Sequence, residues 1–183
     1  RSADAAHTSE HHHEFSPPRL VVNRIVASNA IAIDAAAVKA RELGYEVRSL
    51  GSANAGEAAD EGFRLMGRLL AIRTGRHRVC ILSGGEPTVN LSVRSDINDA
   101  AAPPTSAGRG GRNQELVLAA VAAYKDAADW KNIVLLSGGT DGEDGPTDAA
   151  GAIADEALVK RIIASGIHPD SYLARHDSYT FFA

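Results

Sequence analysis

Two segments of the sequence resemble each other and together predict the fold class. Residues 79–86 read VCILSGGE and residues 133–140 read IVLLSGGT. In each segment a run of four apolar residues leads directly into Ser-Gly-Gly. A short apolar run bounded by turn residues is typical of a strand buried on both faces, and such strands are found in parallel sheets covered by helices. The two segments therefore predict an α/β fold.

The sequence on either side of these runs alternates between strand-like and helix-like patterns. Further strands are predicted at residues 20–28, 45–50 and 88–93, and helices at 29–43, 57–73 and 113–123. The last helix is apolar nearly all round, which predicts that it is deeply packed. Strands that alternate with helices predict a mostly parallel or mixed sheet with flanking helices, in a Rossmann-like three-layer arrangement.

Composition excludes several classes of protein. With 183 residues, 44% hydrophobic and 23% charged, the chain is neither disordered nor a disulfide-stapled miniprotein. Its net charge of −4, without a basic block, argues against nucleic acid as a partner. No apolar run reaches the ~18–20 residues of a membrane helix. Cys80, in an apolar run, is predicted to be a packed thiol in a reducing compartment. We expect a cytoplasmic protein, or a mitochondrial one if a targeting segment precedes residue 1.

Three glycine-rich turns are candidates for binding an anion. The Ser-Gly-Gly turns at 83–85 and 137–139 follow buried strands, and ligands of open α/β sheets bind beyond the carboxyl ends of the strands. The loop at 108–113, GRGGRN, places two arginines at a helix start, where backbone N–H groups also attract anions. It matches neither the Rossmann fingerprint nor the P-loop. The alternatives are tight structural turns at the first two positions and a flexible glycine hinge at the third.

Two further segments carry groups that bind metals. Residues 140–148, TDGEDGPTD, hold four carboxylates, and such a loop can bind Mg²⁺ through one or two of them and water. The alternative is a solvated acidic turn, and the spacing does not fit an EF-hand. Residues 1–19 form a polar, histidine-rich tail or linker, in which His11, His12 and His13 are a metal site or the remnant of a tag, or simply solvated.

Taken together, three segments resemble one family. Residues 83–89, 108–115 and 140–151 occur in the order and form of the C-terminal MOFRL domain of class II glycerate 2-kinases, a family also labelled hydroxypyruvate reductase. Residues 176–182 resemble a further stretch of that domain, and 23–73 resemble the segment before it. The resemblance implies that 20–77 is the end of a preceding kinase domain and that 78–183 is a MOFRL domain without the family's closing motif.

The resemblance also implies an activity, which is the ATP-dependent phosphorylation of D-glycerate at its 2-hydroxyl to give 2-phosphoglycerate. The expected cofactors are ATP and Mg²⁺, and the expected partners are D-glycerate, ATP and an N-terminal kinase domain that this sequence lacks. The fragment is then expected to be inactive alone. Whether the protein forms a homodimer is left open. Two alternatives remain, an NAD(P)H-dependent hydroxypyruvate reductase, against which the missing Rossmann fingerprint counts, and a non-catalytic binding or assembly domain.

The resemblance assigns candidate roles, although it does not identify the general base. The candidate catalytic residues are Glu86, Arg112 and Asp141. The candidate substrate- or phosphate-binding residues are Ser83, Gly84, Gly85, Arg109, Gly110, Asn113, Ser137, Gly138, Gly139, Thr140 and Gly142. The candidate magnesium ligands are Asp141, Asp144 and Asp148.

Overall fold

The described part of the chain is built of alternating strands and helices, as predicted. The computed structural model describes residues 22–73, 77–91 and 108–183. The elements are α1 (Asn29–Glu42), β1 (Glu46–Ser49), α2 (Ala58–Ile72), β2 (Val79–Leu82), α3 (Arg112–Tyr124), β3 (Val134–Gly138), β4 (Gly151–Asp155), α4 (Glu156–Ser165), α5 (Pro169–Leu173) and α6 (Ser178–Phe182). The mixed α/β class with flanking helices is therefore confirmed.

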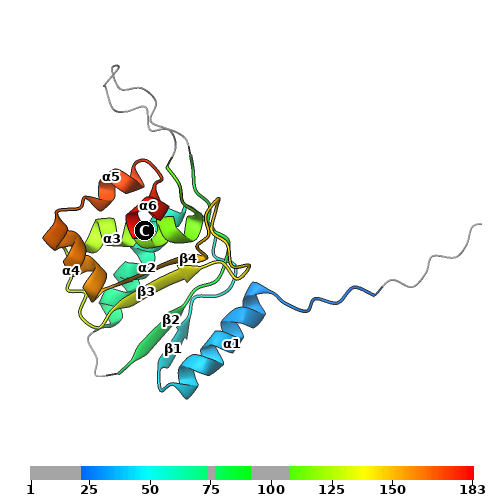
Figure 1. Cartoon of the computed structure of the whole chain (residues 1–183). Helices are drawn as coiled ribbons and strands as arrows, with labels where there is room; N and C mark the ends of the chain where they lie inside the picture. Colours follow the sequence, from blue (N-terminus) through cyan, green and yellow to red (C-terminus); the bar gives the residue numbers. More distant parts are fainter. Residues whose placement is uncertain (1–21, 74–76, 92–107) are drawn as a thin grey trace, which may run out of the picture.

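The strands form two small sheets rather than one. β1 and β2 are parallel, with Glu46 opposite Val79, and α2 makes the crossover between them. β3 and β4 are antiparallel, with Val134 opposite Asp155. Figure 1 shows the two pairs side by side, with α1 on one side of the strands and α2 and α3 on the other. The antiparallel strand β4 was not predicted from the sequence.

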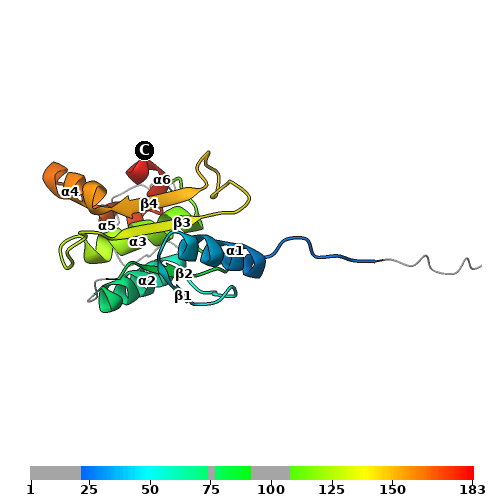
Figure 2. The same ribbon diagram turned by 90° about the horizontal axis from the view of Figure 1, so that it is seen from below.

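The core lies around α3, which is buried from Asn113 to Val121 as its apolar sequence predicts. α2 packs along α3, and the β3–β4 sheet and α5 contact the same region (Figure 2). The two helices approach closely at Gly62, where an added Cβ would lie 2.0 Å from the carbonyl oxygen of Leu116. Because β1 and α2 pack against elements that follow residue 78, the segments on either side of that position share one core.

Two predicted strands are not found. Residues 22–28 have no regular structure, and Val22, Ile25 and Val26 are at least 73% exposed. Apolar residues alone do not make a strand, because a strand also needs a neighbour that takes up its backbone hydrogen bonds. In the second segment only Thr88 makes a bridge, to Glu57, and residues 89–91 have no regular structure. Positions 20–21 and 92–93 lie outside the described residues, as do His11–His13.

β3 is buried on one face only, which corrects the prediction for residues 133–136. Leu135 packs inward, whereas Val134 and Leu136 are each 64% exposed, and Ile153 of β4 is exposed beside them. At the end of β2, the carbonyl of Leu82 accepts a hydrogen bond from the backbone N–H of Leu50, and the N–H of Gly84 donates to the carbonyl of Gly51, both just after β1. The odd-numbered residues of β2 therefore direct their backbone groups to the opposite edge of the strand. No strand among the described residues pairs with that edge.

Cys80 agrees with its predicted packing. The Cys80 thiol is half-buried on β2, and burial raises its pKa above the ordinary value for cysteine, as expected for a packed thiol. Of the helices in the described ranges, none has the length and apolar character needed to cross a membrane.

Candidate functional site

A large cavity lies between the two sheets and extends past the carboxyl ends of β2 and β3. Its volume is about 1610 Å³. Both Ser-Gly-Gly turns and the first turn of α3 line it, so the fold brings together segments far apart in the sequence. The predicted site residues in its lining are Ser83, Gly84, Gly85, Glu86, Arg112, Asn113, Ser137, Gly138, Gly139, Thr140 and Asp141.

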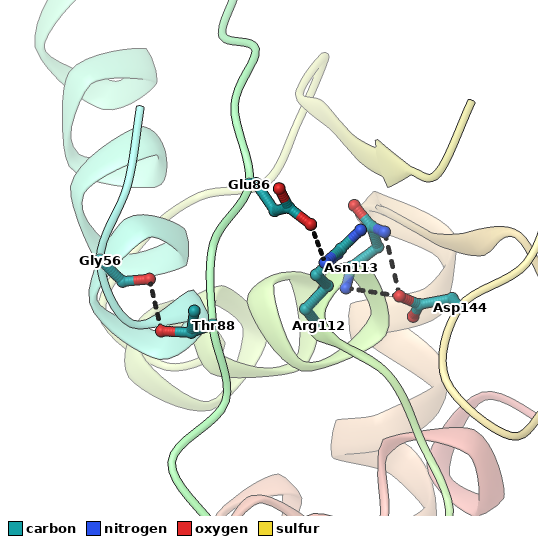
Figure 3. Close-up of polar contacts among 6 residues, drawn as sticks. All are labelled: Gly56, Glu86, Thr88, Arg112, Asn113 and Asp144. Atoms are coloured by element: carbon teal, nitrogen blue, oxygen red, sulfur yellow. Dashed lines mark hydrogen bonds and ion pairs between the residues drawn. The ribbon is translucent and has the colours of Figure 1, made fainter. Parts of the chain in front are cut away.

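Arg112 is the cation that α3 places at the cavity. It is the first residue of the helix, and its Nη1 lies 2.9 Å from Oε1 of Glu86, which follows the first Ser-Gly-Gly turn (Figure 3). The two side chains are 42% and 74% exposed, so an anionic ligand in the cavity can reach the guanidinium. Because an exposed ion pair contributes little stability, this pair is easily exchanged for contacts with a ligand.

Asp144, a predicted magnesium ligand, instead caps α3. Its side chain is buried, and its carboxylate accepts hydrogen bonds from the backbone N–H groups of Asn113 at 2.9 Å and Gln114 at 2.8 Å. It also accepts from Nδ2 of Asn113 at 3.0 Å (Figure 3). These contacts satisfy backbone donors that a helix start leaves without partners. A carboxylate with both oxygens used in this way does not fit the role of a metal ligand.

Two residues absent from the sequence prediction hold the first Ser-Gly-Gly turn. Asn54 donates from Nδ2 to the hydroxyl of Ser83 at 2.7 Å, and that hydroxyl donates to Glu61 at 3.3 Å. Both residues line the cavity. Asn54 lies in the turn after β1 and bridges to Gly85, which extends the parallel pairing beyond the strands. The sequence did carry a signal for Asn54, since it is an amide residue just past the carboxyl end of a predicted parallel strand.

The glycine-rich loop before α3 is held by the C-terminal segment. The backbone N–H of Arg109 donates to Asp177 at 3.1 Å, and its carbonyl accepts from the N–H of Tyr179 at 2.8 Å. The Arg109 guanidinium lies 4.6 Å from the centre of the Tyr179 ring. At Gly110 an added Cβ would lie 2.0 Å from Oγ of Ser178. The loop is therefore closely packed, and neither Arg109 nor Gly110 lines the cavity.

The remaining acidic-loop residues do not gather around one point. Asp148 accepts from the Tyr179 hydroxyl at 2.7 Å, and this hydrogen bond lowers the pKa of the Asp148 carboxyl. Asp141 lies at the cavity, whereas Gly142 and Asp148 do not line it. Across residues 22–73, 77–91 and 108–183, no group of three or more metal-binding side chains is arranged to hold an ion. Asp141 is the one member of this loop's predicted metal set that faces the cavity.

A partly buried acid–histidine pair joins α3 to the C-terminal segment. Nδ1 of His176 lies 3.0 and 3.1 Å from the two carboxylate oxygens of Glu115. Burial raises the pKa of Glu115 above the ordinary glutamate value, although the hydrogen bond from His176 opposes this shift. The nearby charges of Glu57 and Asp144 raise the pKa further. The folded state therefore holds the Glu115 proton to a higher pH than the unfolded state does.

The raised pKa of Glu115 predicts how stability depends on pH. Its contribution is fully present below the ordinary glutamate pKa and is lost as the pH rises through the raised value. The free energy of unfolding of wild type, compared with that of Glu115→Gln, should therefore fall as the pH rises across this window. Urea unfolding at a series of pH values measures the difference. Glu143→Gln, at an exposed position, is the control variant. A difference for Glu115→Gln that rises with pH would contradict the expectation.

The fold defines an α/β domain with a cavity that extends past the carboxyl ends of β2 and β3. The sequence profile of the MOFRL family matches residues 79–183. The chain belongs to this family, which confirms the resemblance read from its three glycine-rich segments.

Several relatives of the chain are longer proteins. A glycerate kinase of Danio rerio is 34% identical, and the match covers 89% of this chain and 38% of that protein. A relative from Agrobacterium vitis, named as a proposed hydroxypyruvate reductase, is 42% identical over 87% of this chain and 39% of its own length. The crystal structure of a glycerate kinase from Thermotoga maritima aligns with a TM-score of 0.70 at 29% identity, covering 87% of this chain and 36% of that one. The chain thus spans less than half the length of these relatives.

Proposed function

We propose that this chain is part of an ATP-dependent D-glycerate 2-kinase, in which it contributes anion- and magnesium-binding loops to a site shared with an N-terminal kinase domain. The observation that carries the proposal is the cavity at which Arg112, Glu86 and Asp141 meet both Ser-Gly-Gly turns. Membership of the MOFRL family and similarity to glycerate kinases support the same reading. The chain alone is expected to have little or no turnover.

In the proposed reaction, the 2-hydroxyl oxygen of D-glycerate bonds to the γ-phosphorus of ATP. The bond from that phosphorus to the bridging oxygen of ADP breaks, and the hydroxyl proton passes to a base that we do not assign. Catalysis of such a transfer consists mainly of positioning and charge stabilisation. Arg112 supplies a guanidinium fork for the glycerate carboxylate or the transferred phosphoryl group.

Magnesium fits the carboxylates that face the cavity. Asp141 and Glu86 both line it, and Mg²⁺ is usually held by one or two carboxylates together with water and substrate phosphate. These two residues would hold the ion, whereas Asp144 and Asp148 are engaged elsewhere. When bound, Mg²⁺ neutralises charge on the phosphate oxygens.

The first prediction of the proposal concerns the product. The full-length protein, incubated with D-glycerate and MgATP, should form 2-phosphoglycerate and ADP, which ³¹P NMR distinguishes from 3-phosphoglycerate. The 183-residue chain, assayed in parallel, serves as the control and should form neither product. Formation of 3-phosphoglycerate, or oxidation of NADH by hydroxypyruvate without ADP, would overturn the proposal, and rapid turnover by the isolated chain would overturn the division of the site.

A further inference from the structure

The two Ser-Gly-Gly turns share a hydrogen-bonding pattern as well as a sequence. Each serine lines the cavity, and its hydroxyl is hydrogen-bonded to an asparagine side chain from another segment. Ser83 is bonded to Asn54, which follows β1, and Ser137 is bonded to Asn113, in the first turn of α3. The direction of these hydrogen bonds decides what each hydroxyl can offer to a ligand.

At the second turn, Asp144 fixes that direction. An ionised carboxylate only accepts hydrogen bonds, so the Asn113 amide must turn its Nδ2 towards Asp144. Its Oδ1 then faces Ser137, whose Oγ lies 2.7 Å away and donates its proton. A reversed amide would set an oxygen against the buried carboxylate. The Ser137 hydroxyl proton is therefore used within the protein, and only oxygen lone pairs remain for a ligand.

At the first turn, Glu61 has the same effect. Its carboxylate accepts the Ser83 proton at 3.3 Å, and Arg64 forms an ion pair with Glu61 at 2.6 Å. Nδ2 of Asn54 donates to Oγ of Ser83 at 2.7 Å. A hydroxyl has one proton and two lone pairs. The Ser83 hydroxyl thus keeps one lone pair that no contact of the described residues uses.

We propose that Ser83 and Ser137 form a subsite for hydroxyl groups, which they recognise as hydrogen-bond acceptors. The subsite does not bind phosphate through these oxygens, because an ionised phosphate oxygen has no proton to donate. Its lone pairs would face the lone pairs of the serine hydroxyl. The inference rests on the proposed function and deepens it. D-Glycerate carries two hydroxyls beside its carboxylate, so the serines would select a hydroxy acid while Arg112 binds the negative charge. Asn113, Asp144 and Glu61 are positioning residues that set the direction of these hydrogen bonds.

The test compares ligands that differ by one hydroxyl. Binding of D-glycerate, D-lactate, 3-hydroxypropionate and inorganic phosphate to the full-length protein is measured by titration calorimetry, in wild type, Ser83→Ala and Ser137→Ala. Loss of one hydrogen bond to a neutral group predicts about 5-fold weaker D-glycerate binding. Each variant should also lose discrimination against the analogue that lacks the hydroxyl it accepts, whereas phosphate binding should change less than about 2-fold. Ser165→Ala, on the exposed end of α4, is the matched control.

The variant Asn113→Ala tests whether Asn113 sets the direction of the Ser137 hydrogen bond. Without the Asn113 oxygen the Ser137 proton is free to turn outward, so phosphate binding should strengthen while D-glycerate binding weakens. The same loss for phosphate as for D-glycerate in the serine variants, no loss for either, or weaker binding of Mg²⁺ alone would overturn the inference. These binding results are independent of turnover. A full-length protein that binds D-glycerate through the serines but never phosphorylates it would refute the proposed function and leave the subsite standing.

Discussion

Arg112→Ala in the full-length protein is expected to lower kcat/KM for D-glycerate by about 10²–10³-fold, the scale that follows from losing one charge-stabilising contact. The loss has two physical sources. The variant lacks the guanidinium that lines the cavity, and it leaves the Glu86 carboxylate without its partner at 2.9 Å, where it would repel an anionic substrate. Arg112→Lys should recover part of the rate, because it restores the charge without the two-pronged geometry.

Arg109→Ala is the matched control for this measurement. Arg109 belongs to the same glycine-rich loop, but its guanidinium packs on the Tyr179 ring and lies outside the cavity lining. Its replacement should cost much less than the replacement of Arg112, in a steady-state assay that varies glycerate at saturating MgATP. Equal losses at the two arginines would mean that the loop acts as one unit and that Arg112 has no special place in the site.

Asp144→Ala is expected to have the largest effect on stability, a loss of about 3 kcal/mol in the free energy of unfolding. The estimate combines a lost helix cap with buried donors left without an acceptor. The carboxylate serves two backbone N–H groups and the Asn113 amide, and it is only 2% exposed, so water cannot easily replace it. Urea unfolding monitored by circular dichroism gives the difference.

Two variants of the same loop make the stability result interpretable. Glu143→Ala removes an exposed carboxylate next to Asp144 and should change the free energy of unfolding by less than about 0.5 kcal/mol. Asp144→Asn keeps the size of the side chain but turns one acceptor into a donor, and should fall between wild type and alanine. A similar loss of unfolding free energy in Glu143→Ala and Asp144→Ala would show that the loss comes from disturbing the loop and not from removing the helix cap.

The sequence predicted the two strands that carry the site because their boundaries are marked chemically. Residues 79–82 are apolar and end at Ser-Gly-Gly, and β2 has those bounds in the structure. β4 was missed because its sequence, GAIAD, contains little that favours a strand; its pairing with β3 creates it. Of the strand predicted at 20–28, the described residues 22–28 have no regular structure for the opposite reason, since they include apolar residues but pair with no strand in the described part of the chain.

The sequence was enough to predict which loops form the site. It was not enough to predict what each residue in those loops does. Asp141 and Asp144 stand three residues apart in one acidic loop, and nothing in that loop separates a residue facing the cavity from one that caps a helix. The difference arises from the position of α3, whose N-terminus lies against Asp144. Arg109 and Arg112 differ in the same way, because the Tyr179 ring that holds Arg109 comes from the end of the chain.

One edge of β2 pairs with no strand in the described part of the chain, and this has a consequence for handling the protein. Exposed strand edges are templates on which other chains assemble, and natural proteins protect them with lysine, proline or a covering segment. β2 reads VCIL and β3 reads VLLSG, without a charge or a proline, and the apolar side chains of Val134, Leu136 and Ile153 stand open beside them. The backbone groups that allow β2 to pair within the fold are therefore also where we expect the isolated chain to associate with other chains.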